Sequence, residues 1–239
     1  MDQRFSGKLV LVSGGTGGLG RAVTLAFLAE GARVAVPYFD ANEFDELKVA
    51  ASPYVGMMEG QKLDVTDEAA VRAFLDGMLT KHRRLDAVVN TIGGYAGGLK
   101  MWEMDAAVFD RMLQLNLRSG FVLSRAVVPA MLKQGHGAIV NVAAKAAVDH
   151  AAGASAYASS KAAAVAMMDS LAADLKGTGI RVNSILPSII DTKANRAAMP
   201  DADFSKWPKP EEIARVILFL CSDDATVVHG AAIPVYGNS

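Results

Sequence analysis

The feature that most restricts the fold of this chain is the stretch SGGTGGLG at residues 13–20, which joins an apolar run to a helical pattern. Residues 8–13 are short, apolar and rich in β-branched side chains, which predicts a buried strand, and apolar residues recur at helical spacing over 18–30. A glycine-rich turn in this position lets the backbone approach a phosphate group, whose charge faces the free amides of the helix N-terminus. The stretch therefore predicts a binding site for the pyrophosphate of a dinucleotide.

The rest of the chain continues to alternate apolar strands with helical patterns. Further strands are predicted at 32–37, 85–90, 137–142, 180–186 and 231–236, and long helical patterns lie at 67–82, 105–134, 155–176 and 211–222. Such alternation, with right-handed crossovers, predicts a parallel sheet covered by helices on both faces. We expect an α/β, doubly wound Rossmann fold: one domain, 1–239, with a mostly parallel seven-stranded sheet. The irregular segment 189–209, rich in Asp, Ala, Met and Pro, predicts a mobile lid over the substrate.

Composition narrows the range of partners and locations. The net charge of the 239 residues is -1 and no helix carries a basic stripe, so nucleic acid is not expected as a partner. Cys221 is the single cysteine, so neither an intramolecular disulfide nor a thiolate metal site is expected, and we predict no metal. The apolar run at 9–12 is too short for a signal peptide or a membrane span, which favours a cytoplasmic protein without a membrane partner.

The order of the short motifs resembles the short-chain dehydrogenase/reductase family over essentially the whole chain. Ser13-Gly14, three residues, then Gly18-Leu19-Gly20 is similar to the T-G-x-x-x-G-x-G motif of that family, and LDVTD, NTIGG, LQLNLRSG, YASSK and ILPSIIDT follow at matching positions. Each motif alone has a plainer explanation, such as Asp64 capping a turn or an asparagine satisfying buried backbone groups. The resemblance implies these cofactor-binding residues: Gly14, Thr16, Gly18, Leu19, Gly20, Tyr38, Asp64, Val65, Asn90, Gly93, Lys161, Pro187, Ile190 and Thr192.

The residue that ends the second strand bears on which nicotinamide cofactor binds. An acidic side chain there hydrogen-bonds the adenosine ribose, whereas a nearby arginine accommodates a 2′-phosphate. This chain has Tyr38 followed by Phe39, so neither rule applies directly. Asp40 lies close enough in sequence to reach back, and the glycine-rich turn carries no basic residue before Arg21. The cofactor is therefore expected to be NADH or NADPH, with NADH favoured.

The resemblance also implies the catalytic residues Tyr157, Lys161 and Asn116. A tyrosine with a pKa near 10 donates and accepts protons poorly at neutral pH unless its anion is stabilised. Lys161 lies one helical turn after Tyr157, on the same face, where an ammonium group would stabilise that anion. Asn116 would complete a proton relay to solvent while hydride moves to or from the nicotinamide.

Ala144 departs from the general pattern of the family. A serine normally stands thirteen residues before the tyrosine and orients the substrate oxygen, so the chain is an inactive enzyme, a weak one, or one whose substrate does not need the hydroxyl. The stretches 93–98, 143–163 and 186–207 resemble the quinonoid dihydropteridine reductase branch, which also has alanine there. That resemblance implies NAD(P)H-dependent reduction of a quinonoid dihydropteridine or a similar flat heterocycle, with Tyr95, Ala144 and Trp207 in the substrate pocket.

Two other functions remain open from the sequence. The C-terminal third, from KPEEIARV onward, resembles general bacterial reductases and favours a carbonyl or 3-oxoacyl-type reductase. The missing serine leaves room for a nucleotide-binding sensor without turnover, although the retained tyrosine, lysine and asparagine argue against it. A small-molecule substrate is expected in the first two cases. The family resemblance and the Ala- and Met-rich helices at 105–134 and 155–176 favour a homodimer or homotetramer.

Overall fold

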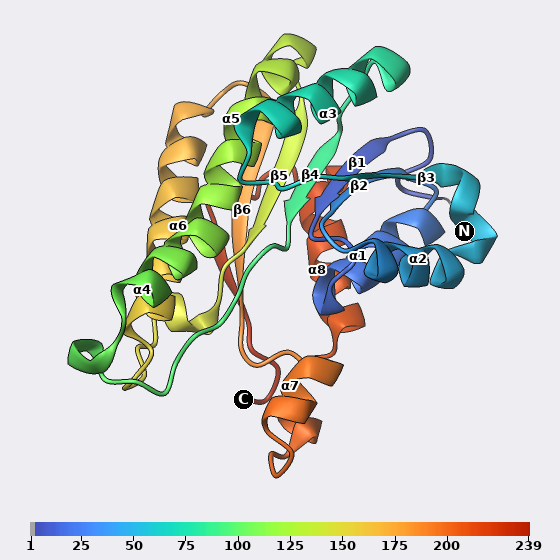
Figure 1. Ribbon diagram of the computed structural model, residues 1–239. Helices are drawn as coiled ribbons and strands as arrows, with labels where there is room; N and C mark the ends of the chain where they lie inside the picture. The colour runs from blue at the N-terminus through green and yellow to red at the C-terminus, as the bar shows by residue number, and fades with distance from the viewer. Residues whose placement is uncertain (1–2) are drawn as a thin grey trace.

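Seven parallel strands form one continuous sheet in the computed structural model, which describes residues 3–239 (Figure 1). Every neighbouring pair of strands is parallel, in the spatial order β3-β2-β1-β4-β5-β6-β7. The strands are β1 (Leu9–Ser13), β2 (Arg33–Tyr38), β3 (Met58–Lys62), β4 (Ala87–Asn90), β5 (Gly137–Val142), β6 (Ile180–Pro187) and β7 (Ala232–Val235). The predicted doubly wound fold is confirmed, and the sheet is parallel throughout.

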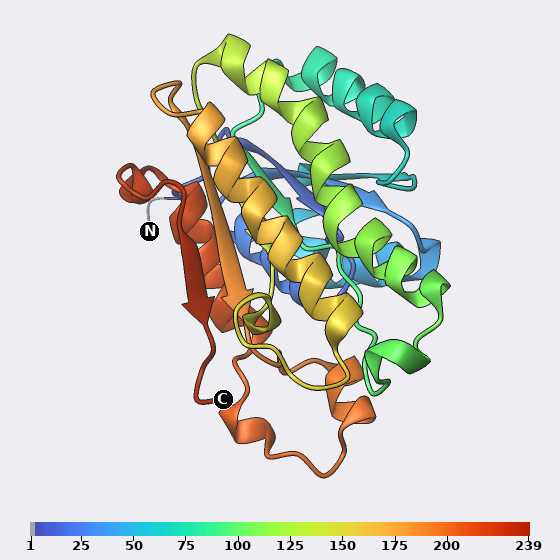
Figure 2. The same ribbon diagram turned by 90° about the vertical axis from the view of Figure 1, so that its left-hand side faces the viewer.

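Helices cover both faces of the sheet, as Figures 1 and 2 show. One face carries α1 (Gly18–Ala29), α2 (Ala41–Ala50) and α8 (Pro210–Cys221), and the other carries α3 (Glu68–His82), α5 (Ser119–Gln134) and α6 (Ser155–Asp174). Two shorter helices, α4 (Ala106–Leu113) and α7 (Lys193–Ala198), lie toward the end of the sheet to which the strands point. Within residues 3–239, every helix is too short or too polar to cross a bilayer.

The alternation of side chains along each strand divides the core into two halves. Val10 and Val12 of β1 pack with α1 and α8, whereas Leu9 and Leu11 pack with α3 and α5. Successive side chains of a strand point to opposite faces, and a parallel sheet buries both faces under helices. This explains why the strands were visible in the sequence as continuous apolar runs.

The strand order reverses between β1 and β4, and this position fixes the site. Ser13 ends β1 and pairs in register with Asn90, which ends β4, so the two following loops diverge from the same point. In open α/β sheets, ligands bind in the crevice at such a switch point, outside the carboxyl ends of the strands. The segment that follows β6 lies at this same end of the molecule (Figure 2).

Four features of the fold differ from the sequence prediction. The edge strand β3 and the helix α2 were not located in the sequence, because MEGQK is polar and α2 buries only Phe44 and Leu47. The helical pattern at 105–134 is one continuous helical segment, but residues Gln114–Arg118 form a π-helical turn between α4 and α5. The helix predicted at 155–176 ends at Asp174, two residues early.

Candidate active site

The glycine-rich turn is held in a shape that a side chain would prevent. A Cβ placed on Gly20 would lie 2.0 Å from the carbonyl oxygen of Gly14, and Gly14 itself has a φ of +75°, in the left-handed region. A Cβ on Gly18 would lie 2.8 Å from the methyl group of Thr192, so the turn also touches the segment after β6. Glycine is therefore required here for backbone approach and for helix packing.

The first turn of α1 fits the pyrophosphate of a dinucleotide. Its N-cap is Gly17, which provides no capping side chain, and no acidic residue lies in the first turn. The helix therefore begins with backbone amides that no side chain satisfies and with the positive end of its dipole uncompensated. Leu19 points into the core and anchors the turn. The contacts of these individual residues with a cofactor stay predictions.

The loop that follows β4 is organised by Asn90 and Thr91. The side-chain amide of Asn90 donates to Oδ1 of Asn141 (3.0 Å), and its own Oδ1 accepts from the backbone amide of Ile92 (3.3 Å). The hydroxyl of Thr91 donates to the carbonyl oxygen of Ser13 at 2.8 Å. These bonds tie the ends of β1, β4 and β5 together, so Asn90 has a structural task whatever it does for a cofactor.

The residues predicted around the adenosine have clear structural roles. Asp64 accepts from the amide and the hydroxyl of Thr66, both at 2.8 Å, and so forms the turn after β3. Val65 is buried in the core. Tyr38 stacks on Phe44, with ring centroids 4.2 Å apart and planes 5° apart. Asp40, considered as a ribose ligand, instead caps α2 by accepting from the amide of Asn42 at 2.7 Å.

The three predicted catalytic residues come from two neighbouring helical segments. Tyr157 and Lys161 lie on α6, and Asn116 lies in the π-helical turn between α4 and α5. A Cβ on Gly93 would lie 3.0 Å both from Oδ1 of Asn116 and from Nζ of Lys161. Gly93 is thus the point where the loop after β4 packs closely between the amide and the ammonium group, which explains why it lacks a side chain.

Asn116 and Lys161 are both fixed by hydrogen bonds. The amide of Asn116 donates to the carbonyl oxygen of Gly94 (3.0 Å) and its Oδ1 accepts from the Gly94 amide (2.9 Å). Nζ of Lys161 donates to the carbonyl oxygen of Val142, at the end of β5, at 3.0 Å. Single-turn π segments are common at functional sites, and this one turns the asparagine toward the loop after β4.

The sequence analysis did not identify Ser160 as part of this cluster. Its hydroxyl accepts from Nδ2 of Asn116 (2.9 Å) and donates to the backbone carbonyl of Tyr157 (2.7 Å). Ser160 is fully buried and links the π-helical turn to the first turn of α6. Its spacing of three residues from Tyr157 places it on the same helix face, which is the signal that could have found it.

Burial shifts the two proton-transfer groups in opposite directions. Burial, with a smaller contribution from Tyr95, raises the pKa of Tyr157 to about 12. Burial lowers the pKa of Lys161 to about 8. The sequence led us to expect that Lys161 would stabilise the tyrosine anion, but in this structure its ammonium faces a backbone carbonyl and the phenol stays protonated. A protonated phenol is the form required of a proton donor.

The three residues predicted to line the substrate pocket, Tyr95, Ala144 and Trp207, differ in exposure. Ala144 is 6% exposed and begins the short 3₁₀ turn after β5. Tyr95 is 70% exposed and meets Tyr157 edge to face, with ring centroids 5.0 Å apart and planes 74° apart. Trp207 is 7% exposed and packs 5.0 Å from Phe204, as an anchor of its segment would. The substrate contact predicted for Trp207 stays a prediction.

The segment after β6 is held by hydrogen bonds among its own residues. Pro187 ends the strand, and the carbonyl oxygen of Ile190 accepts from the Thr192 amide and from Nδ2 of Asn195, both at 2.8 Å. Thr192 caps α7 by accepting from the Asn195 amide at 3.2 Å. Thr192 lies against Gly18 of the glycine-rich turn. The cofactor contacts predicted for Pro187, Ile190 and Thr192 stay predictions. The mobility expected of 189–209 stays a prediction.

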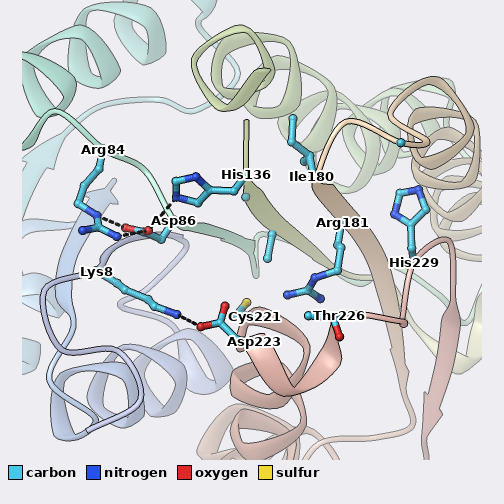
Figure 3. A pocket seen from close by; sticks show the side chains of 14 residues that line it. Lys8, Arg84, Asp86, His136, Ile180, Arg181, Cys221, Asp223, Thr226 and His229 are labelled. Carbon is cyan, nitrogen blue, oxygen red and sulfur yellow. Dashed lines mark hydrogen bonds and ion pairs between the residues drawn. The ribbon is translucent and has the colours of Figure 1, made fainter. Parts of the chain in front are cut away.

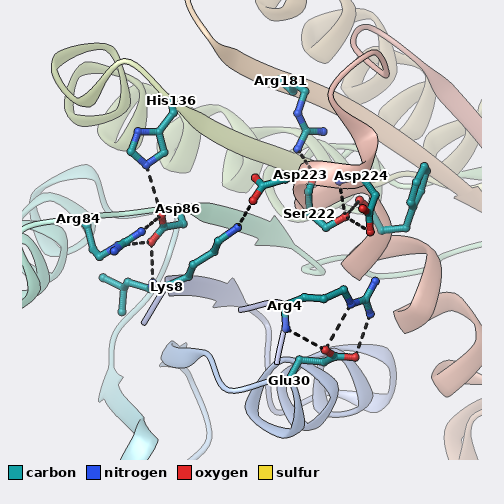
Figure 4. Close-up of polar contacts among 12 residues, drawn as sticks. Arg4, Lys8, Glu30, Arg84, Asp86, His136, Arg181, Ser222, Asp223 and Asp224 are labelled. Carbon is teal, nitrogen blue, oxygen red and sulfur yellow. Dashed lines mark hydrogen bonds and ion pairs between the residues drawn. The ribbon is translucent and has the colours of Figure 1, made fainter. Parts of the chain in front are cut away.

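A cavity of about 600 Å³ lies at the opposite, amino end of the strands (Figure 3). Its charged groups are largely engaged: Lys8 binds Asp223 at 2.8 Å, and Arg84 binds Asp86 at 2.6 and 2.7 Å (Figure 4). The guanidinium of Arg181 donates to the carbonyl oxygens of Leu220 and Ser222, at the C-terminal end of α8. Among residues 3–239, no group of three or more His, Cys, Asp or Glu side chains is arranged to hold a metal ion.

Fold, glycine-rich cradle and tyrosine–lysine pair together define a dinucleotide-binding oxidoreductase of the Rossmann type. The sequence matches the family model described as short chain dehydrogenase over residues 8–203. The chain belongs to the short-chain dehydrogenase/reductase family. As a member it is an oxidoreductase that uses a nicotinamide dinucleotide and a small-molecule substrate.

Relatives and solved structures match along nearly the whole chain. The sequence is 34% identical to the 3-oxoacyl-(acyl-carrier-protein) reductase FabG of Thermotoga maritima, with 98% of each chain covered. It is 33% identical to the 7alpha-hydroxysteroid dehydrogenase of Escherichia coli, covering 98% of this chain and 94% of that one. The structure resembles ElxO with NADP bound at a TM-score of 0.91 (25% identity, 96% and 97% covered) and levodione reductase at 0.90 (28%, 98% and 97%).

Proposed function

We propose that the protein is an NAD(P)H-dependent reductase that uses Tyr157 as proton donor and reduces a quinonoid dihydropteridine or a similar flat, conjugated heterocycle. The observation that carries this proposal is Ala144 in the place where the family has a serine, in a chain that retains Tyr157, Lys161 and Asn116. Reduction of a conjugated cyclic imine needs a hydride and a proton. It does not need a side chain to hold a developing alkoxide.

The exposed ring of Tyr95 beside Tyr157 favours a flat substrate. The ring of Tyr95 is exposed and stands edge-on to Tyr157, so it offers an aromatic surface next to the proton donor. Aromatic rings pack favourably against other planar π systems in offset or edge-to-face geometry. The segment 189–209, as a lid, would cover a substrate bound there and exclude water. Ala144, buried just beyond the end of β5, adds no hydrogen-bonding group there.

The mechanism rests on the state of the groups in the cluster. The bound cofactor supplies the hydride. Tyr157 stays protonated at neutral pH because burial raises its pKa to about 12, so it can donate its proton to the substrate as the substrate gains hydride. Lys161 is positioned by Val142 to carry a replacement proton, and Ser160 holds Asn116 against the turn that bears Tyr157. Asn116 in turn fixes the loop at Gly94.

The substrate proposal is tested by turnover with a chemically generated quinonoid dihydropterin. We expect the purified protein to oxidise NADH or NADPH in the presence of this compound and to reduce simple ketones poorly. Comparing the rates of the wild type and Ala144→Ser with both substrates tests the role of the missing hydroxyl. The proposal is wrong if neither nucleotide is consumed with the pterin while a ketone is reduced efficiently.

A carbonyl or 3-oxoacyl-type reductase is the second candidate, favoured by the 34% identity to the FabG reductase across the full chain. For this function Ala144→Ser should raise ketone reduction by about a hundredfold, the size of the effect of one preorganised donor at a developing oxyanion. An unchanged rate with ketones would argue against it and in favour of the heterocycle.

We also propose that the protein assembles as a homodimer or homotetramer. The outer face of α4, α5 and α6 carries a shallow groove lined by Leu113, Leu117, Phe121 and Met167, and Phe121 is nearly half exposed. Covering such a face with the same face of a second copy would remove this apolar surface from water. Size-exclusion chromatography with light scattering tests this, and a clean monomer would contradict it.

A further inference from the structure

We propose that Glu43, on the first turn of α2, is the residue that selects NADH over NADPH, in place of the acidic side chain missing at the end of β2. The inference deepens the proposed function and rests on it, since it concerns the cofactor of the same site. It begins from one contact: the hydroxyl of Thr16, in the glycine-rich turn, donates to Oε2 of Glu43 at 2.8 Å. Twenty-seven residues separate the two in sequence.

This contact places a carboxylate where an adenosine ribose would lie. In Rossmann folds the pyrophosphate binds at the glycine-rich turn, and the ribose hydroxyls face the end of β2. Thr16 belongs to the turn and α2 begins three residues after β2 ends, so Glu43 bridges the two elements that flank the ribose. Its second oxygen, Oε1, takes part in none of the hydrogen bonds formed among residues 3–239 and remains available to a hydroxyl group.

The residues at the end of β2 are committed to other contacts. Tyr38 is stacked on Phe44, and the carboxylate of Asp40 is used to cap α2. The stack has a further consequence, because it holds the first turn of α2 close to the sheet and so presents Glu43 toward Thr16. The carboxylate that would bind the ribose hydroxyls is therefore on α2 and not at the end of β2.

Two basic residues nearby are already paired with other carboxylates. Arg21 of α1 is bound by Glu46, at 3.2 Å to its carboxylate and 2.9 Å to its carbonyl oxygen. Lys48 pairs with Asp45 at 2.6 Å. Lys62 ends β3 in register with Tyr38 and is the opposing charge, so the proposal requires that Glu43 outweigh it. A carboxylate at Glu43 accepts hydrogen bonds from ribose hydroxyls but repels a 2′-phosphate, which carries nearly two negative charges.

The proposal is tested by measuring the dissociation constants of NADH and NADPH for the substrate-free protein, using nucleotide fluorescence or calorimetry. The wild type should bind NADH more tightly. In Glu43→Gln the ratio of the two dissociation constants should shift toward NADPH by about tenfold, mainly because NADPH binds more tightly. Asp76→Asn is the matched control, since it removes one exposed negative charge from α3, on the opposite face of the sheet, and it should leave the ratio unchanged.

Ionic strength gives an independent measurement of the same charge. Salt screens exposed charges, so raising it should narrow the NADH preference of the wild type and have little effect on the ratio in Glu43→Gln. A wild type that prefers NADPH, or a Glu43→Gln ratio equal to that of the wild type, overturns the assignment of Glu43. Failure of both nucleotides to bind would instead overturn the proposed function itself, so the two failures are distinguishable. A wild-type preference for NADPH that is lost in Lys62→Ala would move the selectivity to β3 and also reject Glu43.

Discussion

The two ends of the sheet use their polar groups in opposite ways. At the amino end, Asp86 is 8% exposed and receives bonds from the amide of Leu9 and from Arg84, with His136 at 3.3 Å. At the carboxyl end, the first amides of α1 meet no capping side chain, and the phenol of Tyr157 lies beside the exposed ring of Tyr95. The amino end is electrostatically satisfied, whereas the carboxyl end is prepared for a ligand.

This difference shows that the volume of a cavity is a poor guide to function here. The cavity at the amino end measures about 600 Å³, yet its charges neutralise one another or cap the end of α8. At the carboxyl end the groups are shifted in pKa by burial, which is frequent at catalytic sites. Variants at the two ends should therefore separate activity from stability.

The largest effect is expected for Tyr157→Phe at the carboxyl end. Removal of a positioned general acid should lower kcat by about 10² to 10⁴-fold, while nucleotide binding stays close to that of the wild type. Steady-state kinetics and a fluorescence titration measure the two. Tyr95→Phe is a suitable comparison, because it removes the other phenol of the pair and keeps both rings, and it should retain most of the rate. Equal losses in both variants would contradict Tyr157 as the proton donor.

At the amino end, Asp86→Asn should reduce stability and spare activity. Loss of a buried carboxylate that holds an arginine and a backbone amide should lower the free energy of unfolding by about 2 kcal/mol. Because Arg84 and the other donors lower the pKa of Asp86, its stabilisation is present above pH about 4 and is lost as pH falls through the folded-state pKa. Urea denaturation at several pH values measures this. A lowered kcat with unchanged stability would assign Asp86 to the active site.

The pH dependence of catalysis should report on Lys161. Because burial lowers its pKa to about 8, the ammonium loses its proton above that pH and kcat/KM for the nucleotide should fall about tenfold per pH unit. The phenol of Tyr157, with a pKa of about 12, causes no change in kcat/KM in the neutral pH range. In Lys161→Arg the side chain stays charged, so the fall of kcat/KM at alkaline pH should disappear. Circular dichroism checks that the variant is folded. An alkaline limb that is the same in both proteins would assign the titration to another group.

The smallest effect is expected for Asp223→Asn at the amino end. Asp223 is mostly exposed, so its pair with Lys8 is screened by water and salt. We expect a loss below about 1 kcal/mol in the free energy of unfolding, decreasing further in high salt. A loss as large as that of Asp86→Asn would show that the cavity depends on this pair.

The apolar part of the fold was predictable because both faces of a parallel sheet are buried. Strands such as β5 and β6 have bounds within one residue of the prediction, since nearly every side chain in them is apolar or enclosed. The edge strand β3 pairs on one side only, with β2, and the exposed residues of MEGQK give no apolar signal. Helix α2 was missed for the same reason.

The candidate site was predictable where the chemistry depends on local spacing. Tyr157 and Lys161 are one turn apart on a helix, and the turn glycines follow a strand, so both patterns are visible in the sequence. The contacts of Ser160 with Asn116 and of Glu43 with Thr16 join residues that are 44 and 27 positions apart. Such contacts depend on how helices pack, and a single sequence does not specify that.

The π-helical turn at Gln114–Arg118 makes the spacing of this region unusually intolerant to insertion and deletion. Each residue added to or removed from a helix rotates everything beyond it by about 100° about the axis. Loss of one residue between 113 and 119 would let ordinary α-helical bonding run through, and would turn Asn116 away from Gly94 and Ser160. Point substitutions there can be tolerated by repacking, but a change in length cannot, so length in this segment is the property to compare among homologous reductases.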